Sequence, residues 1–285
     1  MIPAPFEYER ADSVDHALEL LGRFGGEAKV LAGGHSLIPL MKLRFATPTA
    51  LVDIGRLVDL AYVRDGGDHL AIGALTTYRA LVDDELLRRE CGLIPRVASV
   101  IGDVQVRERG TIGGSVAHAD PASDLPAALV ALEATMVLTG PAGERTVPAS
   151  GFFESFLTSA LAKDELLTEL RVPKLGGWGF AYEKFTKRSS DWAIVGVAAA
   201  VRRENGSVAE ARVGLCNMGV TPLRAASVES ALAGEPAGTE AFAAAAAEVA
   251  ADGSEVPEDL NATAAYRGHL ARVLTRRALE RAARA

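Results

Sequence analysis

Two glycine-rich segments are the parts of this sequence best suited to binding an anion. They are Gly33-Gly34-His35-Ser36 and Gly110-Thr111-Ile112-Gly113-Gly114-Ser115. Glycine lets the backbone approach a ligand closely and adopt a positive φ, so each segment could direct N–H groups at a phosphate. Two converging loops could bind a diphosphate without Lys or Arg. The alternative is that both segments are turns at strand ends, and their spacing leaves the choice open.

Common signatures of catalysis are missing around these segments. Neither glycine pattern matches the dinucleotide fingerprint G-x-G-x-x-G or the P-loop, which disfavours a Rossmann or Walker-type site. Ser36 has no local partner that would activate it, and the Gly-x-Ser-x-Gly elbow is absent. His35 and His118 do not form a metal-ligand spacing. We therefore predict no catalytic side chain and no metal site.

Polar side chains follow the second glycine-rich segment at short spacing. They are His118, Asp120 and Asp124. A carboxylate here could accept hydrogen bonds from sugar hydroxyls, or it could cap the next helix. Capping is favoured for Asp120, because Pro121 can occupy the first helical position.

Two further residues have both a binding and a structural interpretation. Lys184 belongs to a small basic cluster with Lys187 and Arg188, whose default interpretation is a solvated strand end. Trp192 could stack on a planar ring, although core packing is the commoner environment for a Trp beside an apolar strand.

The hydrophobic pattern predicts mixed helices and strands around these residues. The first helix begins after Ser13 as N-cap and ends at Gly25-Gly26. The glycine-rich stretch Pro173–Gly179 is the best linker candidate. Predicted strands span 29–32, 50–54, 62–64, 69–72, 135–138, 165–172, 180–185, 194–202 and 208–217. Predicted helices span 37–43, 77–90, 93–101, 121–133, 225–233, 239–251 and 264–284.

Composition excludes several classes of protein. The 285 residues carry a net charge of −7 and a pI near 5.4, which argues against a nucleic-acid or polybasic membrane-surface binder. The N-terminus lacks the pattern of a signal peptide, and no apolar run is long enough for a membrane helix. Cys91 and Cys216 share no motif, and a disulfide between them is possible but unsupported. We expect a cytoplasmic protein.

Longer motifs around the glycine-rich segments resemble a known family. Residues 32–44 closely resemble the first flavin loop of the medium subunit of aerobic carbon monoxide dehydrogenases, and residues 105–126 resemble the second. The resemblance covers essentially the whole chain, and it identifies a member of the molybdenum hydroxylase flavoprotein family. It implies an α+β fold: a FAD-binding domain over residues 1–173, with subdomains of approximately 1–58 and 59–173, and then a smaller α+β C-terminal domain over 178–285.

The resemblance also implies FAD and the residues that contact it. The diphosphate would lie against Gly33–Ser36 and Thr111–Ser115, and Asp124 matches a flavin-contacting Asp of the family. Many relatives have Asn where this chain has Ser115. No four-cysteine insertion is present, which excludes the relatives with an extra cluster in this subunit. The implied cofactor-binding residues are Ala32, Gly33, Gly34, His35, Ser36, Leu37, Ile101, Thr111, Ile112, Gly113, Gly114, Ser115, His118, Asp120, Asp124, Leu167, Lys184 and Trp192.

The implied role is electron transfer within a hetero-oligomer. A large partner subunit with a molybdenum cofactor would oxidise substrate, and a small partner with two-iron clusters would pass electrons to FAD and on to an external acceptor. One alternative is a self-sufficient flavin oxidase. Another is a flavin-free assembly or ligand-binding subunit that keeps the loops as structure.

Overall fold

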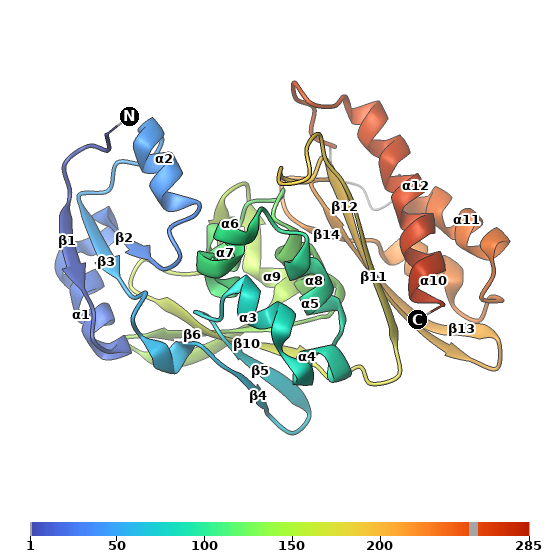
Figure 1. The fold of residues 1–285 in the computed structure, drawn as a ribbon, viewed down its shortest axis with the longest axis horizontal. Coiled ribbons are helices and arrows are strands. Elements are labelled where there is room, and N and C mark those ends of the chain that lie inside the picture. The colour runs from blue at the N-terminus through green and yellow to red at the C-terminus, as the bar shows by residue number, and fades with distance from the viewer. Residues whose placement is uncertain (1, 251–255, 285) are drawn as a thin grey trace.

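The computed structural model describes residues 2–250 and 256–284, which form three blocks side by side along the long axis (Figure 1). The first block is a parallel sheet in the order β1-β3-β2. Its strands are β1 (Glu7–Arg10), β2 (Ala28–Leu31) and β3 (Ala50–Asp53), joined by α1 (Val14–Phe24) and α2 (Leu37–Leu43). Ser13 caps α1 by accepting the N–H of His16, as predicted, and Gly25 ends the helix at a φ of 60°.

The second block is an antiparallel sheet covered by short helices. Its strand order is β4-β5-β10-β6-β7. The strands are β4 (Val63–Asp65), β5 (His69–Gly73), β6 (Thr135–Gly140), β7 (Gly143–Pro148) and β10 (Leu166–Pro173), with the small pair β8 (Phe153–Ser155) and β9 (Thr158–Ser159) beside them. The helices are α3 (Tyr78–Asp83), α4 (Glu85–Glu90), α5 (Leu93–Ser99), α6 (Val104–Arg109), α7 (Ile112–His118), α8 (Asp124–Ala131) and α9 (Ala149–Phe152). Their apolar faces and the sheet enclose the largest core cluster.

The third block is the C-terminal domain, an antiparallel sheet in the order β11-β12-β13-β14. Its strands are β11 (Gly179–Phe185), β12 (Val195–Glu204), β13 (Ser207–Cys216) and β14 (Leu223–Arg224). The helices α10 (Ala226–Leu232), α11 (Thr239–Ala247) and α12 (Ala264–Ala282) pack on one face and form a second core. A turn with positive φ at Asn205 and Gly206 joins β12 to β13, as expected for a two-residue hairpin.

Small side chains let the C-terminal sheet pack directly on the helices of the second block. Alternate residues of β12 face opposite sides: Val197 and Val201 lie in the C-terminal core, whereas Ala198 and Ala200 lie in the core of the second block. Opposite Ala198 on β13 is Gly214, where a Cβ atom would lie 2.0 Å from the backbone oxygen of Ala127 in α8. The two domains therefore meet backbone to backbone.

This contact predicts a large effect of Gly214→Val on stability. Because the added atoms would meet the α8 backbone, we expect the free energy of unfolding to fall by about 3 kcal/mol. Urea unfolding measures the loss. The matched control is Gly151→Val, since a Cβ at Gly151 meets nothing within 4 Å. Equal stability of the two variants would contradict the packing described here.

Several predicted elements differ from the structure. The second glycine-rich segment is not a loop: Thr111 is the N-cap of α7, and Gly113 and Gly114 lie in its first turn. The predicted helix over residues 77–90 is interrupted at Asp84, which caps α4. The predicted helix over 239–251 corresponds to α11, which ends at Ala247 and is followed by a 3-10 turn over Glu248–Ala250; residue 251 lies outside the described residues. The short helix α6 was not predicted.

The proposed cap at Asp120 is wrong. The helix α8 begins three residues later than Pro121, and Ser123 occupies its N-cap position. The Asp120 Oδ1 atom instead accepts the N–H of Ala122 at 2.8 Å, which fixes a turn before the helix. Cys91 and Cys216 are both free, buried thiols. None of the helices in residues 2–250 and 256–284 is both long enough and apolar enough to cross a membrane.

Candidate functional site

The fold brings the two glycine-rich segments into direct contact. A Cβ atom at Gly33 would lie 2.2 Å from the backbone oxygen of Arg109 and 3.0 Å from the Cα atom of Gly110. A Cβ atom at Gly114 would lie 3.9 Å from the Cβ atom of Ala32. Glycine at position 33 is therefore a requirement of the contact between the parallel sheet and the junction of α6 with α7.

The first segment offers free backbone donors. Gly34 has a φ of 77°, and its carbonyl accepts the N–H of Ile38 as α2 begins. Within the described part of the chain, no hydrogen bond is donated by the N–H groups of residues 33–36. Ser36 occupies the N-cap position of α2, and its side chain makes no capping hydrogen bond. Four consecutive N–H groups and a free hydroxyl are a donor set that suits a phosphate.

The second segment contributes in a different way from the first. The N–H of Ile112 donates to Thr76, that of Gly113 to Ala74, and those of Gly114 and Ser115 to Thr111. Within the described part of the chain, Thr111 is therefore the one residue of this segment whose N–H donates no hydrogen bond, so the expectation of several free N–H groups does not hold here. What it offers is a close approach at its glycines and the hydroxyl of Thr111, which accepts the Gly114 N–H at 3.2 Å and keeps its own proton to donate.

The polar residues His118, Asp120 and Asp124 lie in two different environments. His118 ends α7 with its Nε2 atom 4.0 Å from Asp120 Oδ2, and both side chains are partly exposed. Burial lowers the pKa of the His118 imidazole, and Lys29 of β2 adds to the effect, while Asp120 opposes it. The His118 imidazole is therefore a neutral donor or acceptor. Asp124 lies deeper, at the first residue of α8.

Asp124 forms a buried ion pair with Lys184. The Lys184 Nζ atom lies 2.9 Å from Asp124 Oδ2, and the two side chains are only 8% and 5% exposed. The same ammonium is 3.4 Å from the carbonyl oxygen of Val100. Burial raises the pKa of the Asp124 carboxyl, and the Lys184 charge and the Tyr182 hydroxyl oppose the rise. The pair links α8 of the second block to β11 of the C-terminal domain.

Tyr182 is a site residue that the sequence reasoning missed. Its hydroxyl donates to Asp124 Oδ1 at 2.5 Å. It precedes Lys184 by two positions on β11, so both side chains point to the same face of the strand. That alternation was available in the sequence, but it could not show that Asp124 lies opposite.

A chain of contacts joins the ion pair to the glycine-rich segments. A Cβ atom at Gly110 would lie 2.5 Å from the ring of Tyr78. Burial raises the pKa of the Tyr78 phenol to about 12, with a smaller contribution from the nearby charge of Asp124 and an opposing one from the Ser115 hydroxyl.

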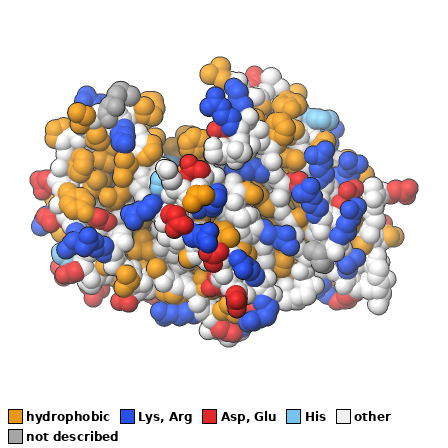
Figure 2. Space-filling model, viewed as in Figure 1, with side chains coloured by type: hydrophobic (Ala, Val, Ile, Leu, Met, Phe, Trp, Pro, Cys, Tyr) orange, Lys and Arg blue, Asp and Glu red, His pale blue; other side chains and the backbone are white. Residues whose placement is uncertain are grey.

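The surface of the molecule is hollowed at its upper edge, between α2 and the upper ends of β11 and β12 (Figure 2). In the same view, α6 and α7 lie between these elements (Figure 1).

The other predicted residues differ in how deeply they are buried and in how near they lie to this region. Ile101 is half-buried beside Val100, and its carbonyl accepts the Arg107 guanidinium at 3.0 Å. Leu167 is 5% exposed on β10, against which α7 packs. Ile112 is fully buried and its N–H donates to Thr76, so neither its side chain nor its N–H is open to a ligand. Trp192 is 70% exposed in the loop between β11 and β12, away from the core of either domain.

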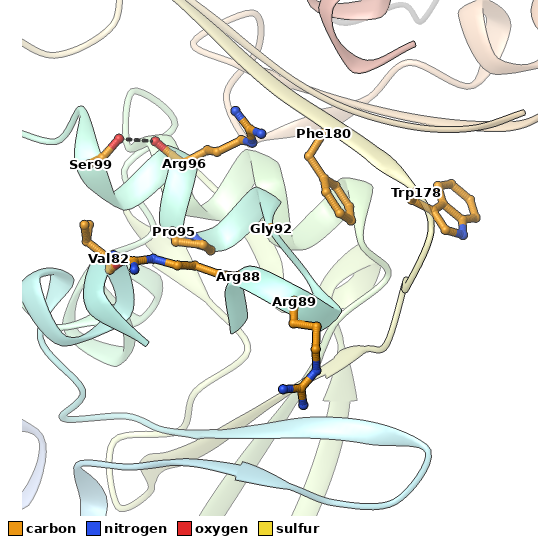
Figure 3. A pocket seen from close by; sticks show the side chains of 9 residues that line it. All are labelled: Val82, Arg88, Arg89, Gly92, Pro95, Arg96, Ser99, Trp178 and Phe180. Atoms are coloured by element: carbon orange, nitrogen blue, oxygen red, sulfur yellow. Dashed lines mark hydrogen bonds between the residues drawn. The ribbon is translucent and has the colours of Figure 1, made fainter. Parts of the chain in front are cut away.

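Two cavities open between the helices of the second block and the C-terminal domain. One of about 450 Å³ opens between α4, α5 and β11, and Figure 3 shows its arginines directed apart. A second of about 430 Å³ continues it towards the end of α12. Both are lined by Arg96, Ser99 and Phe180, and the second also by Val100 and Tyr182, which adjoin the Asp124–Lys184 pair. These cavities are not the site that the glycine-rich segments form.

Comparison with known proteins gives matches along the whole chain. The model of the FAD binding domain in molybdopterin dehydrogenase matches residues 4–175, and that of the CO dehydrogenase flavoprotein C-terminal domain matches residues 180–282. The carbon monoxide dehydrogenase medium chain of Hydrogenophaga pseudoflava is 43% identical over 283 residues, covering 99% of this chain and 98% of the relative.

Two further comparisons agree with this match. The glyceraldehyde dehydrogenase medium chain of Sulfolobus acidocaldarius is 35% identical over 283 residues, covering 99% of this chain and 100% of its own length. A solved structure of carbon monoxide dehydrogenase from Hydrogenophaga pseudoflava, which lacks the Mo-pyranopterin moiety, superposes with a TM-score of 0.95 at 44% identity. That superposition covers 99% of this chain and 98% of the matched chain.

Proposed function

The chain belongs to the molybdenum hydroxylase flavoprotein family, as an FAD-binding medium subunit of the carbon monoxide dehydrogenase type, and from this premise we propose its role in electron transfer. The proposed role is to connect the iron–sulfur clusters of a partner subunit with an external electron acceptor. The observation that carries it is the direct contact of the two glycine-rich segments at Gly33 and Gly110, which forms a cradle that any Cβ atom at Gly33 would fill.

The residues present fit FAD. The free N–H groups of residues 33–36 and the Ser36 and Thr111 hydroxyls would hold the diphosphate. Asp124 and Lys184 would contact the flavin from the domain boundary, beside Ile101, with Leu167 and Trp192 as further proposed contacts. When bound, FAD supplies both one-electron and two-electron redox chemistry.

The chain's own residues bind and orient rather than catalyse. The buried pair Asp124–Lys184 places a fixed charge of each sign at the boundary of the two domains. His118 and Asp120 would add a partly exposed polar pair at the end of α7. We assign no catalytic residue, because the proposed role requires no proton acceptor for a substrate.

We further propose that the chain works in a hetero-oligomer with a large molybdenum-cofactor subunit and a small subunit with two-iron clusters. The surface of this chain supports a protein partner. Large apolar side chains are exposed on and after α2, namely Ile38, Leu43 and Phe45, at 38%, 50% and 79%. Figure 2 shows hydrophobic side chains gathered over this part of the molecule. Apolar patches of this kind mark interaction surfaces.

We propose that the substrate is selected by the partner. The two curated relatives compared above are named for different substrates, carbon monoxide and glyceraldehyde, yet each aligns with this chain over nearly its full length. Medium chains of one architecture therefore occur in enzymes with different chemistry at the substrate.

An absorbance spectrum tests the proposal. The purified chain is incubated with FAD and desalted, and we expect flavin bands to be retained. Gly114→Trp should lose them, because its side chain would enter the contact between the loops beside Thr111 and Ala32. Gly151→Trp is the matched control, since a Cβ there meets nothing within 4 Å. A colourless wild-type chain, also when co-expressed with partner subunits, would favour the flavin-free alternative.

Turnover distinguishes the second alternative. We expect the isolated chain to show no substrate oxidation, because the proposed function places that step in the molybdenum subunit. Oxidation of a substrate by the purified, FAD-loaded chain alone would favour a self-sufficient flavin oxidase.

A further inference from the structure

Both carboxylate oxygens of Asp124 are engaged by side chains of one strand of the other domain. Tyr182 donates to Oδ1 at 2.5 Å and Lys184 to Oδ2 at 2.9 Å. These two residues lie two positions apart on β11, whereas Asp124 begins α8. The carboxylate is thus held from two directions, and its rotation is fixed.

Burial makes this arrangement necessary. Asp124 is 4% exposed, and an ionised carboxylate at such depth is stable only when it is paired and hydrogen-bonded. Lys184 supplies the opposite charge, and the Tyr182 hydroxyl supplies a second donor to the charged form. A hydrogen bond to a charged group contributes more than one between neutral groups.

The fold makes room for the Tyr182 phenol. A Cβ atom at Gly196 of β12 would lie 2.4 Å from the Tyr182 hydroxyl oxygen and 3.0 Å from the Cβ atom of Cys216. Gly196 pairs with Lys184 on one side and Cys216 on the other. The phenol therefore reaches Asp124 across a position where only glycine fits.

We propose that Tyr182 is a positioning residue of the flavin site, which keeps Asp124 ionised and Lys184 in place and thereby sets the lowest pH at which the chain holds FAD. This inference rests on the proposed function, because Asp124 and Lys184 are proposed there as flavin contacts. Tyr182 acts through Asp124 and needs no contact of its own with the flavin.

Among the groups around it, the Asp124 carboxyl is the one whose charge we expect to be lost as the pH falls. Tyr182 and Lys184 face it from β11, Cys216 from β13 and Tyr78 from α3. Burial raises the pKa values of the Tyr182 and Tyr78 phenols and of the Cys216 thiol, so all three stay neutral. Removing the Tyr182 hydroxyl removes a group that lowers the pKa of Asp124, so that pKa rises further.

The experiment is the dissociation constant of FAD measured between pH 5 and pH 8. For Tyr182→Phe we expect the pH at which FAD binding begins to weaken to move about one to two units towards neutrality. A shift of this size corresponds to the free energy of one hydrogen bond to a charged group. Asp124→Asn should bind FAD with no such pH dependence. The matched control is Tyr62→Phe, which removes a phenol bonded to Glu169 at 2.7 Å elsewhere in the fold. Its profile should follow that of the wild type.

A second measurement needs no flavin. Removing the Tyr182 hydroxyl destabilises the ionised carboxylate only, so the difference in unfolding free energy between wild type and Tyr182→Phe should be largest at pH 8 and shrink towards pH 5. A difference independent of pH, or an FAD profile that superposes on that of Tyr62→Phe, would overturn the proposal. If the wild type binds no FAD at any pH, the proposed function fails, and the unfolding comparison still tests the state of Asp124.

Discussion

Gly33→Ala is expected to weaken FAD binding by roughly 100-fold, although it adds a single methyl group. The added Cβ atom would lie 2.2 Å from the backbone oxygen of Arg109. Backbone cannot swing aside as a flexible side chain can, so the first glycine-rich segment must separate from the start of α7. The free N–H groups of residues 33–36 are then no longer held against the junction of α6 with α7. Titration of the apo chain with FAD, followed by flavin fluorescence, measures the loss.

Gly22→Ala is the matched control for this change. Gly22 lies inside α1, where a Cβ atom would meet nothing within 4 Å. Because alanine favours a helix over glycine, this variant should be slightly more stable and should bind FAD as the wild type does. Wild-type affinity in Gly33→Ala would show that the diphosphate is not bound at this contact.

Lys184→Met is expected to lower the free energy of unfolding by about 3–5 kcal/mol at neutral pH. The substitution leaves Asp124 as a buried carboxylate whose remaining side-chain partner is the neutral Tyr182. Burial already raises the pKa of this carboxyl, and loss of the Lys184 charge raises it further. The folded protein can then relieve the cost by taking up a proton. The deficit should therefore be full at high pH and shrink as the pH falls through the raised pKa.

The double variant Lys184→Met with Asp124→Asn separates charge from packing. An amide still accepts the Tyr182 hydroxyl, and neither buried side chain then carries a charge. We expect most of the lost stability to return, since the cost of the single variant is that of an unpaired charge. Urea unfolding of the four proteins of the cycle at pH 8 gives the coupling directly. A double variant as unstable as Lys184→Met would mean that the pair's role is packing alone.

Local signals in the sequence determined many of the elements. Ser13 and Gly25 bound α1 as predicted, because capping hydrogen bonds and a positive φ depend on neighbouring residues alone. The β12–β13 hairpin forms around Asn205 and Gly206 for the same reason. The motifs around residues 32–44 and 105–126 also carried the family, which the full-length relatives confirm.

The helix at the second glycine-rich segment shows where local reasoning failed. Glycine pairs disfavour helices, yet Gly113 lies in the first turn of α7, because its lack of a side chain lets the helix pack on Ala74. That packing takes up the N–H of Gly113, and Thr111 at the helix N-terminus takes up those of Gly114 and Ser115. Tertiary contact, and not propensity, decided what this segment can offer a ligand.

The site as a whole was decided by the tertiary structure. Gly33 touches Gly110 and Asp124 touches Tyr182 across long stretches of intervening chain, and no local pattern encodes such distances. The sequence by itself determined which chemical groups are present and most of the elements that carry them. Only the packing of the three blocks against one another could decide which of those groups meet. A buried charge is stable only when it has a partner, and the partners of Asp124 come from another domain.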